Sequence, residues 1–380
     1  MLLKGNDDVF TIELPKCDIE FTRYLYIKEE VKLSLLVSIL QKNDDAIFWA
    51  YELYYSGFKH ELFNFIWKIY YDFFATLNPN FGAYLFKKHL TFVSCDKTIS
   101  AIIQDFLIRP FNTDIFFLRI LKPAIVYHTP NIKTKEDLYS NFKLWIVTYD
   151  YRSMSHFILN EKHTFSITDI YILVLDILKL KSVLRRLKDL DNSLQISINP
   201  NIILLSKIMS VLSNNKKGKN FYICVDAEEI KQYETIETSD KIKHYNILKR
   251  ACRCSIDELK HLSLFKLKRK KHNITTMYLN NWEYQASFSP IWFDRYKQFG
   301  GFIDYKKQRL VFKDDDKMEQ FYARYGYEPD EQPVSVQDKS IMKIECVINW
   351  KWFNNTYLFN GLFKITDNEL EEFDVNGIEY

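Results

Sequence analysis

Glycine and proline are scarce in this chain, and the scarcity limits the folds that it can adopt. The 380 residues include 9 Gly and 9 Pro, whereas average usage of about 7% and 5% would give roughly three and two times as many. The chain also has 30 Phe and 25 Tyr, and one aromatic side chain can bury on the order of 150–250 Å². Few chain breakers and many bulky rings predict long helices packed around an aromatic core, in two or three domains.

Residues 44–79 predict two antiparallel helices joined by a tight loop. Asp44 can N-cap a helix that ends at Gly57, where glycine suits a left-handed cap. The next helix begins near His60, repeats apolar residues at helical spacing, and ends before Pro79. We expect the aromatic face of this pair to be core rather than a base-stacking slot. That face comprises Trp49, Tyr54, Tyr55 and Trp67.

A long helix is predicted to begin at Thr168 or Asp169 and to end in a basic stretch near Lys188. Apolar residues at helical spacing predict one buried stripe along it. The stripe comprises Ile170, Leu173, Val174, Ile177, Leu180, Leu184 and Leu187.

The pattern changes at the polar, basic stretch 213–220, which is the best linker candidate. We therefore predict an α+β protein, predominantly α-helical. Residues 1–212 form a helical domain, an irregular stack of helix hairpins with one short strand. Residues 220–380 form a smaller mixed domain that packs against it and ends in the acidic tail 366–380. Strands are predicted at 9–14, 221–225, 309–312, 344–352 and 357–365, and a helix at about 318–325.

Charge and cysteine content limit the compartment and the partners. A net charge of +3 is too small to imply a polyanionic partner for the whole chain. Six scattered cysteines favour a reducing compartment over a disulfide framework. The most apolar segment, 170–187, is interrupted by five charged residues, which argues against a membrane span and a membrane partner. We expect the protein in the cytosol or a cytosolic compartment.

A basic segment, residues 241–272, is the strongest candidate for nucleic-acid binding. It holds eleven Lys and Arg against two acidic residues, and such a cluster gains affinity by releasing phosphate counterions. Tyr245, Phe265 and Tyr278 are placed to add stacking. The alternative is a solvated loop in a lysine-rich chain, in which Lys outnumbers Arg by 40 to 12. The candidate residues are Lys249, Arg250, Arg253, Lys266, Lys268, Arg269, Lys270 and Lys271.

Two further clusters contain metal-binding residue types. The first comprises His244, Cys252, Cys254 and His261, but a C-x-C spacing is too tight for the usual zinc knuckle. The second is the acidic run 314–316, with Asp304 and Glu319 nearby. Three consecutive aspartates cannot all face one Mg²⁺ ion, and such a run also caps helices. We expect neither cluster to bind metal.

The sequence contains no phosphate-binding loop and no nucleophile motif. We therefore also expect no cofactor and no catalytic residues.

Four segments carry a resemblance to a known group of proteins. They read D-A-I-F-W-A-Y-E-L-Y-Y-S-G-F, I-W-K-I-Y-Y-D-F-F-A-x-x-N-P, W-E-Y-x-A-S-F-S-P-I-W and F-Y-x-x-Y-G-Y-E-P-D-E-Q. These segments resemble an uncharacterised protein family of mimivirus-type nucleocytoplasmic large DNA viruses. The resemblance implies a viral protein made in infected host cytoplasm, and it supplies no activity or site residues.

Three functions are compatible with this sequence. The first is a non-enzymatic scaffold that binds viral or host proteins in viral gene expression, including translation, or in replication. The second is a protein that binds RNA or DNA through the basic segment. The third is a virion component or a divergent metal-dependent enzyme that uses the run 314–316. The expected location is host cytoplasm, extending to the viral factory or the virion.

Replacing Lys268, Arg269, Lys270 and Lys271 together by Ala tests the nucleic-acid hypothesis. If the four side chains contact phosphates, the slope of log K against log salt on duplex DNA becomes shallower by about 3–4. Thermal stability should change little, because a solvated basic run packs against no core. A wild-type protein with no affinity for DNA or RNA in low salt would leave the segment as a charged loop.

Overall fold

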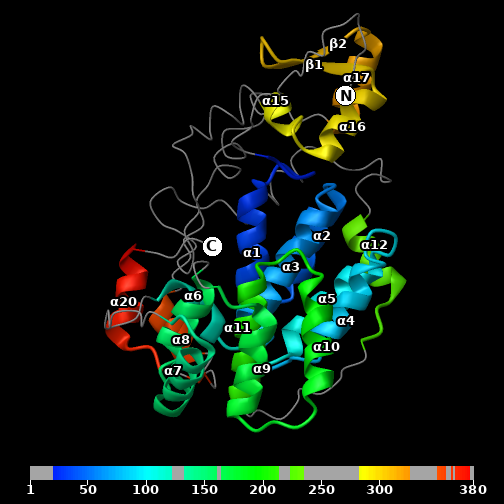
Figure 1. Ribbon diagram of the computed structural model, residues 1–380. Coiled ribbons are helices and arrows are strands. Elements are labelled where there is room, and N and C mark those ends of the chain that lie inside the picture. Colours follow the sequence, from blue (N-terminus) through cyan, green and yellow to red (C-terminus); the bar gives the residue numbers. More distant parts are fainter. Residues whose placement is uncertain are drawn as a thin grey trace, which may run out of the picture.

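The computed structural model describes residues 20–121, 132–160, 164–213, 223–234, 282–325, 349–356, 361–362 and 364–376 (Figure 1). In these ranges the protein is predominantly α-helical, and its regular strands form one two-stranded antiparallel sheet. The predicted fold class, α+β with a large helical part and a smaller mixed part, is therefore confirmed. The predicted strand 9–14 and all of the predicted linker 213–220 except Ser213 lie outside these residues, so the boundary between the two domains stays a prediction.

The helical part is built from short and medium helices. Its elements are α1 (Lys28–Leu40), α2 (Asp45–Tyr55), α3 (Lys59–Ile69), the π-helical turn η1 (Tyr70–Phe74), α4 (Phe81–His89), α5 (Lys97–Ile108), α6 (Asp114–Ile120), α7 (Lys135–Thr148), α8 (Tyr151–Leu159), α9 (Ile167–Ile177), α10 (Val183–Leu194) and α11 (Pro200–Leu212). Helix α2 packs against α1, α3 and α5, and α11 packs against α8, α9 and α10.

The remaining elements follow in the second half of the chain. They are α12 (Ala227–Glu234), α15 (Trp282–Ala286), α16 (Pro290–Gln298), β1 (Gly301–Asp304), β2 (Arg309–Phe312), α17 (Asp315–Tyr325), α19 (Trp350–Thr356) and α20 (Asp367–Asn376). Elements α15 to α17 form a module at one end of the molecule, at the top of Figure 1. Helix α20 lies beside α6 and α8, far from that module.

The predicted pair of helices at 44–79 is confirmed, with one correction at its start. The backbone N–H of Asp45 donates to Asn43 Oδ1 at 2.9 Å, so Asn43 caps α2 and the Asp44 side chain does not. Gly57 follows α2 with φ of +89°, a conformation that suits glycine. The aromatic face is core, as predicted: Trp49, Tyr54 and Trp67 are buried and Tyr55 packs against them.

The predicted single helix over 168–188 is wrong, because the chain forms two helices. Helix α9 ends at Ile177, and Lys179 takes φ of +51°. The N–H of Leu180 donates to the carbonyl of Leu175, which is the Schellman pattern with lysine in the usual glycine position. The chain therefore turns, and Leu184, which was predicted to be buried, is 84% exposed on α10.

Three of the predicted strands are also corrected. Residues 223–225 form no strand and lead directly into α12. The described part of 344–352 enters helix α19, because Trp350 and Phe353 lie three residues apart on one buried face. Residues 361–362 and 364–365 form no strand. Within the acidic tail, Asp367–Asn376 form helix α20, whose Leu370 is buried.

The predicted strand 309–312 and the helix that follows it are confirmed. Strand β2 pairs with β1 in the register Gly301 to Phe312 and Asp304 to Arg309. Asp314 Oδ1 accepts the backbone N–H of Asp316 at 3.0 Å at the start of α17. The acidic run therefore has the helix-capping role that the sequence favoured.

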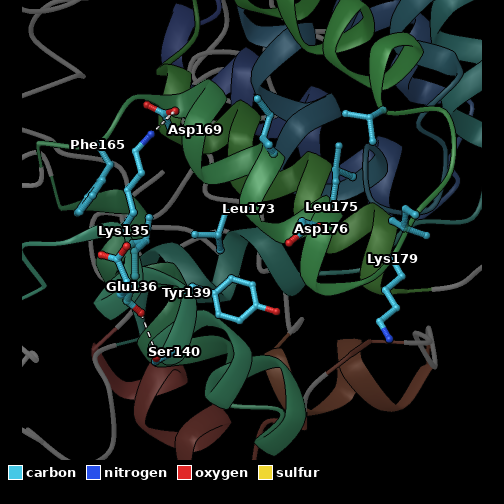
Figure 2. A pocket seen from close by; sticks show the side chains of 14 residues that line it. Lys135, Glu136, Tyr139, Ser140, Phe165, Asp169, Leu173, Leu175, Asp176 and Lys179 are labelled. Atoms are coloured by element: carbon cyan, nitrogen blue, oxygen red, sulfur yellow. Dashed lines mark hydrogen bonds and ion pairs between the residues drawn. The ribbon is translucent and has the colours of Figure 1, made fainter.

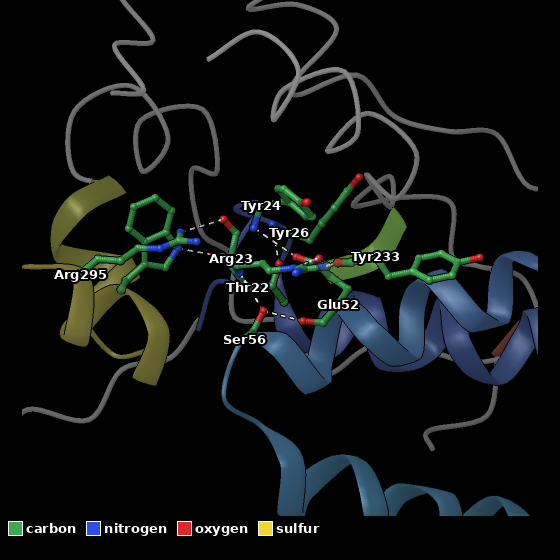
Figure 3. A network of polar contacts seen from close by, with 9 residues as sticks. Thr22, Arg23, Tyr24, Tyr26, Glu52, Ser56, Tyr233 and Arg295 are labelled. Carbon is green, nitrogen blue, oxygen red and sulfur yellow. Dashed lines mark hydrogen bonds and ion pairs between the residues drawn. The ribbon is translucent and has the colours of Figure 1, made fainter. Parts of the chain in front are cut away.

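Residues 21–24, here called the N-terminal clasp, join the two halves of the chain (Figure 3). Arg23 Nε donates to Glu52 Oε2 at 3.0 Å, and its Nη2 donates to the Tyr233 carbonyl at 2.6 Å. Trp292 Nε1 donates to the Thr22 carbonyl at 2.9 Å, so the clasp holds α2, α12 and α16 together. The prediction that the two halves pack together is confirmed.

A second junction closes α19 and α20 onto α6. The Trp350 ring packs against Phe116 and Phe117 with centroid separations of 5.6 and 5.1 Å. The backbone N–H of Leu362 donates to Asp114 Oδ2 at 3.0 Å. These contacts bring the last described helices back onto the middle of the helical part.

Gly57 provides a test of the packing between α2 and α16. A Cβ at this position would lie 2.7 Å from Pro290 Cβ, and φ is positive. Gly57→Ala should lower the free energy of unfolding by about 2–3 kcal/mol in denaturant titrations, because strain and overpacking add. Gly300→Ala is the matched control: its φ is +71°, but its nearest neighbour lies 3.6 Å away on the flexible Lys317 chain. An equal loss for both variants would contradict this packing.

Asp114 predicts a pH dependence of stability. Burial raises the pKa of its carboxyl to about 7, so the folded state binds a proton more tightly than the unfolded state. The free energy of unfolding should therefore fall as pH rises from about 4 to about 7. Asp114→Asn should flatten this fall, because an amide does not titrate in this pH range, while its oxygen can still accept from Leu362.

Denaturant titrations at pH 5 and pH 8 measure the effect. Asp169→Asn is the control, because a hydrogen bond from Ser166 and the charge of Lys135 lower the pKa of the Asp169 carboxyl instead. Retention of the wild-type pH dependence in Asp114→Asn would assign it to other groups.

Candidate interaction groove

An open groove of about 750 Å³ lies between α7 and α9 and continues along the turn into α10. Its apolar floor includes Leu138 from α7, Leu173 and Leu175 from α9, and Leu180 and Val183 beyond the turn. Figure 2 shows Leu173 and Tyr139 approaching one another across the groove. The groove therefore has two helical walls and an apolar base.

The two walls are held in place by helix caps and by packing between the helices. Thr134 and Asp137 form a reciprocal capping box at the start of α7. Ser166 Oγ accepts the Asp169 N–H at 3.0 Å at the start of α9. Helix α7 buries Leu138 and Phe142 on one face, and α9 packs against both α7 and α11, so the two walls hold a fixed position relative to one another.

Two of the lining residues, Lys135 and Asp169, form an ion pair on the rim of the groove. Lys135 Nζ lies 3.4 Å from Asp169 Oδ1, and Ser166 Oγ donates to Asp169 Oδ2 at 2.7 Å. The hydrogen bond from Ser166, with the charge of Lys135, lowers the pKa of the Asp169 carboxyl. This carboxylate is therefore already satisfied by the protein itself.

The rest of the rim carries charges without such partners. Glu136, Asp176 and Lys179 line the groove, and no described residue forms an ion pair with any of their side chains. Ile172 and Tyr139, also on the rim, are 41% and 38% exposed. Apolar side chains thus face solvent between two carboxylates and an ammonium group, an arrangement suited to contact with another molecule.

The candidate residues named from the sequence lie elsewhere. All eight candidate Lys and Arg residues of the basic segment lie outside the described residues, as do His244, Cys252, Cys254 and His261. The nucleic-acid hypothesis therefore stays a prediction. Among the described residues, no cluster of three or more His, Cys, Asp or Glu is arranged to hold a metal ion.

Asp304 has a local structural role similar to that of the acidic run. Its Oδ1 accepts the backbone N–H groups of Lys306 and Lys307, both at 3.1 Å, in the turn between β1 and β2.

None of the described helices has the length and apolarity needed to cross a membrane.

The groove was not predicted from the sequence, although one signal was present. Segment 167–177 reads I-T-D-I-Y-I-L-V-L-D-I, which has apolar residues on more than one face of a helix. A helix with two apolar faces must either pack against neighbours on both faces or leave one apolar face exposed to solvent. The contacts of α9 with α7, α10 and α11 leave Ile172 41% exposed.

Comparisons with known proteins give no assignment. The chain matches no model of a known protein family, no curated protein and no solved structure.

Proposed function

We propose that this protein is a non-enzymatic scaffold that binds a partner protein in the α7–α9 groove. The observation that carries the proposal is the apolar floor of the groove between rim charges that no described residue pairs with. Ile172 and Tyr139 remain partly exposed there, and covering apolar area is worth roughly 25 cal/mol per Å². A partner that covers the groove gains this free energy and can also pair the rim charges.

The rigidity of the surroundings supports binding without a large rearrangement. Helix α9 packs on α11, and its end is fixed by the turn at Lys179. The groove is therefore preformed, and a partner need not supply the free energy to order it. A preformed surface on a rigid helical frame is what a scaffold requires.

The setting of this function follows from the resemblance of four segments to proteins of large DNA viruses. We place the scaffold in infected host cytoplasm, in viral gene expression, including translation, or in replication. The viral factory and the virion are further sites at which the same binding could operate.

Affinity purification of the tagged protein from infected cells tests the proposal. Ile172→Glu places a charge in the groove and should reduce recovery of a co-purifying protein by about tenfold or more. Leu184→Glu is the matched control, because Leu184 is 84% exposed and does not line the groove. Both variants should melt at the wild-type temperature.

Nuclease treatment before purification separates the two leading functions. A scaffold retains its partner after nuclease treatment, whereas a nucleic-acid-binding protein loses it. Equal recovery with Ile172→Glu and Leu184→Glu would overturn the groove as the binding site.

A further inference from the structure

We infer that the occupant of the α7–α9 groove is an amphipathic helix of a partner protein, with Lys or Arg flanking its apolar stripe. This inference rests on the proposed function and adds the chemistry of the partner. It comes from the backbone of the groove walls, the length of the groove and the charges along its rim.

The backbone of the walls favours a helix over an extended peptide. An extended segment buries N–H and C=O groups that must find partners, usually at a sheet edge. Both walls are helices, and the end of α9 is closed because Lys179 and Leu180 donate to the carbonyls of Asp176 and Leu175. The groove therefore has no backbone edge to pair with. A helix brings its own satisfied backbone and needs only side-chain contacts.

The length of the groove suits a few helical turns. Helix α9 has 11 residues, which corresponds to about 16 Å at a rise of about 1.5 Å per residue. A partner helix of about three turns spans this distance and presents apolar side chains at i, i+3 or i+4, and i+7. Such side chains would meet Leu173, Ile172 and Tyr139 along the floor and rim.

The charges along the rim of the groove indicate which residues flank the apolar stripe of the partner helix. Asp169 is paired with Lys135, so it offers little to a ligand. Glu136 and Asp176 have no charged partner among the described residues, and neither has Lys179. The unpaired set is therefore net negative. Asp176 lies three and four residues from Leu173 and Ile172 on α9, so a partner cation beside the apolar stripe can reach it.

A second copy of the chain is a poorer fit. Helix α10 carries the exposed Leu184 with Arg185 and Lys188. However, Leu184 is the single large apolar residue that α10 exposes to a high degree. A single exposed apolar side chain does not form an apolar stripe, so α10 of another copy could fill only part of the groove. Self-association is therefore an outcome that the experiment must be able to detect.

A displayed peptide library tests the inference on the full-length protein. Each peptide is a helix with Leu fixed at i, i+4 and i+7, and the flanking positions are randomised. Wild-type protein should enrich Lys and Arg at the flanking positions, whereas Asp176→Lys should enrich Asp and Glu. Leu184→Glu, the control outside the groove, should select the same residues as wild type.

Individual peptides then give the size of the effect by fluorescence anisotropy. Exchanging the selected Lys for Glu should weaken binding to wild type by roughly fivefold or more, and Asp176→Lys should reverse this preference. Ile172→Glu should abolish binding of both peptides. Sedimentation of the wild type alone should give a monomer.

The outcomes separate the two proposals. Peptides selected without charge preference, or peptides that bind Ile172→Glu as well as wild type, would overturn the inference. No enrichment over a library with scrambled Leu positions would also overturn it, and so would a dimer that Ile172→Glu dissociates. In these cases the scaffold function stands if co-purification still depends on Ile172, and both proposals fall if it does not.

Discussion

The buried ion pair between Arg23 and Glu52 is the interaction on which the arrangement of the chain depends. Both side chains are almost fully buried, and Glu52 also accepts the backbone N–H of Tyr24 at 3.1 Å. A buried pair of this kind is stable only when further hydrogen bonds satisfy it, because each charge loses its hydration. Removing one partner leaves an uncompensated buried charge, so the pair fixes the position of the N-terminal clasp.

The N-terminal clasp holds the fold together because one short segment forms hydrogen bonds with several helices. The Arg23 N–H donates to Ser56 Oγ at 2.8 Å, which secures the end of α2. Arg295 of α16 lies between the rings of Trp292 and Tyr325, 4.5 and 4.6 Å from their centroids, and it donates to the Arg23 carbonyl. The module of α15 to α17 thus adjoins the helical part through polar contacts with a defined geometry.

The sequence predicts the paired helices at 44–79, but it predicts neither the break at Lys179 nor the groove. The paired helices at 44–79 follow from local signals, because Gly57 marks a turn that few other residues accept. The break at Lys179 has no such signal, since lysine normally continues a helix. The segment around the two tryptophans of α19 has the composition of a strand. Only the structure shows that Trp350 and Phe353, three residues apart, share one buried face of a helix. The groove depends on which face of α9 meets α11, and that contact between distant segments is not encoded in local periodicity.

The closure of α19 onto α6 has a consequence for biosynthesis. Phe116 and Phe117 are covered by Trp350, so their cover emerges from the ribosome only after roughly 230 further residues, or on the order of 10–50 s at usual elongation rates. Throughout that interval the faces of Phe116 and Phe117 that Trp350 covers lack their partner ring. The two rings can therefore reach their final packing only after Trp350 has been translated, and a chain that ends before Trp350 leaves this part of the core uncovered.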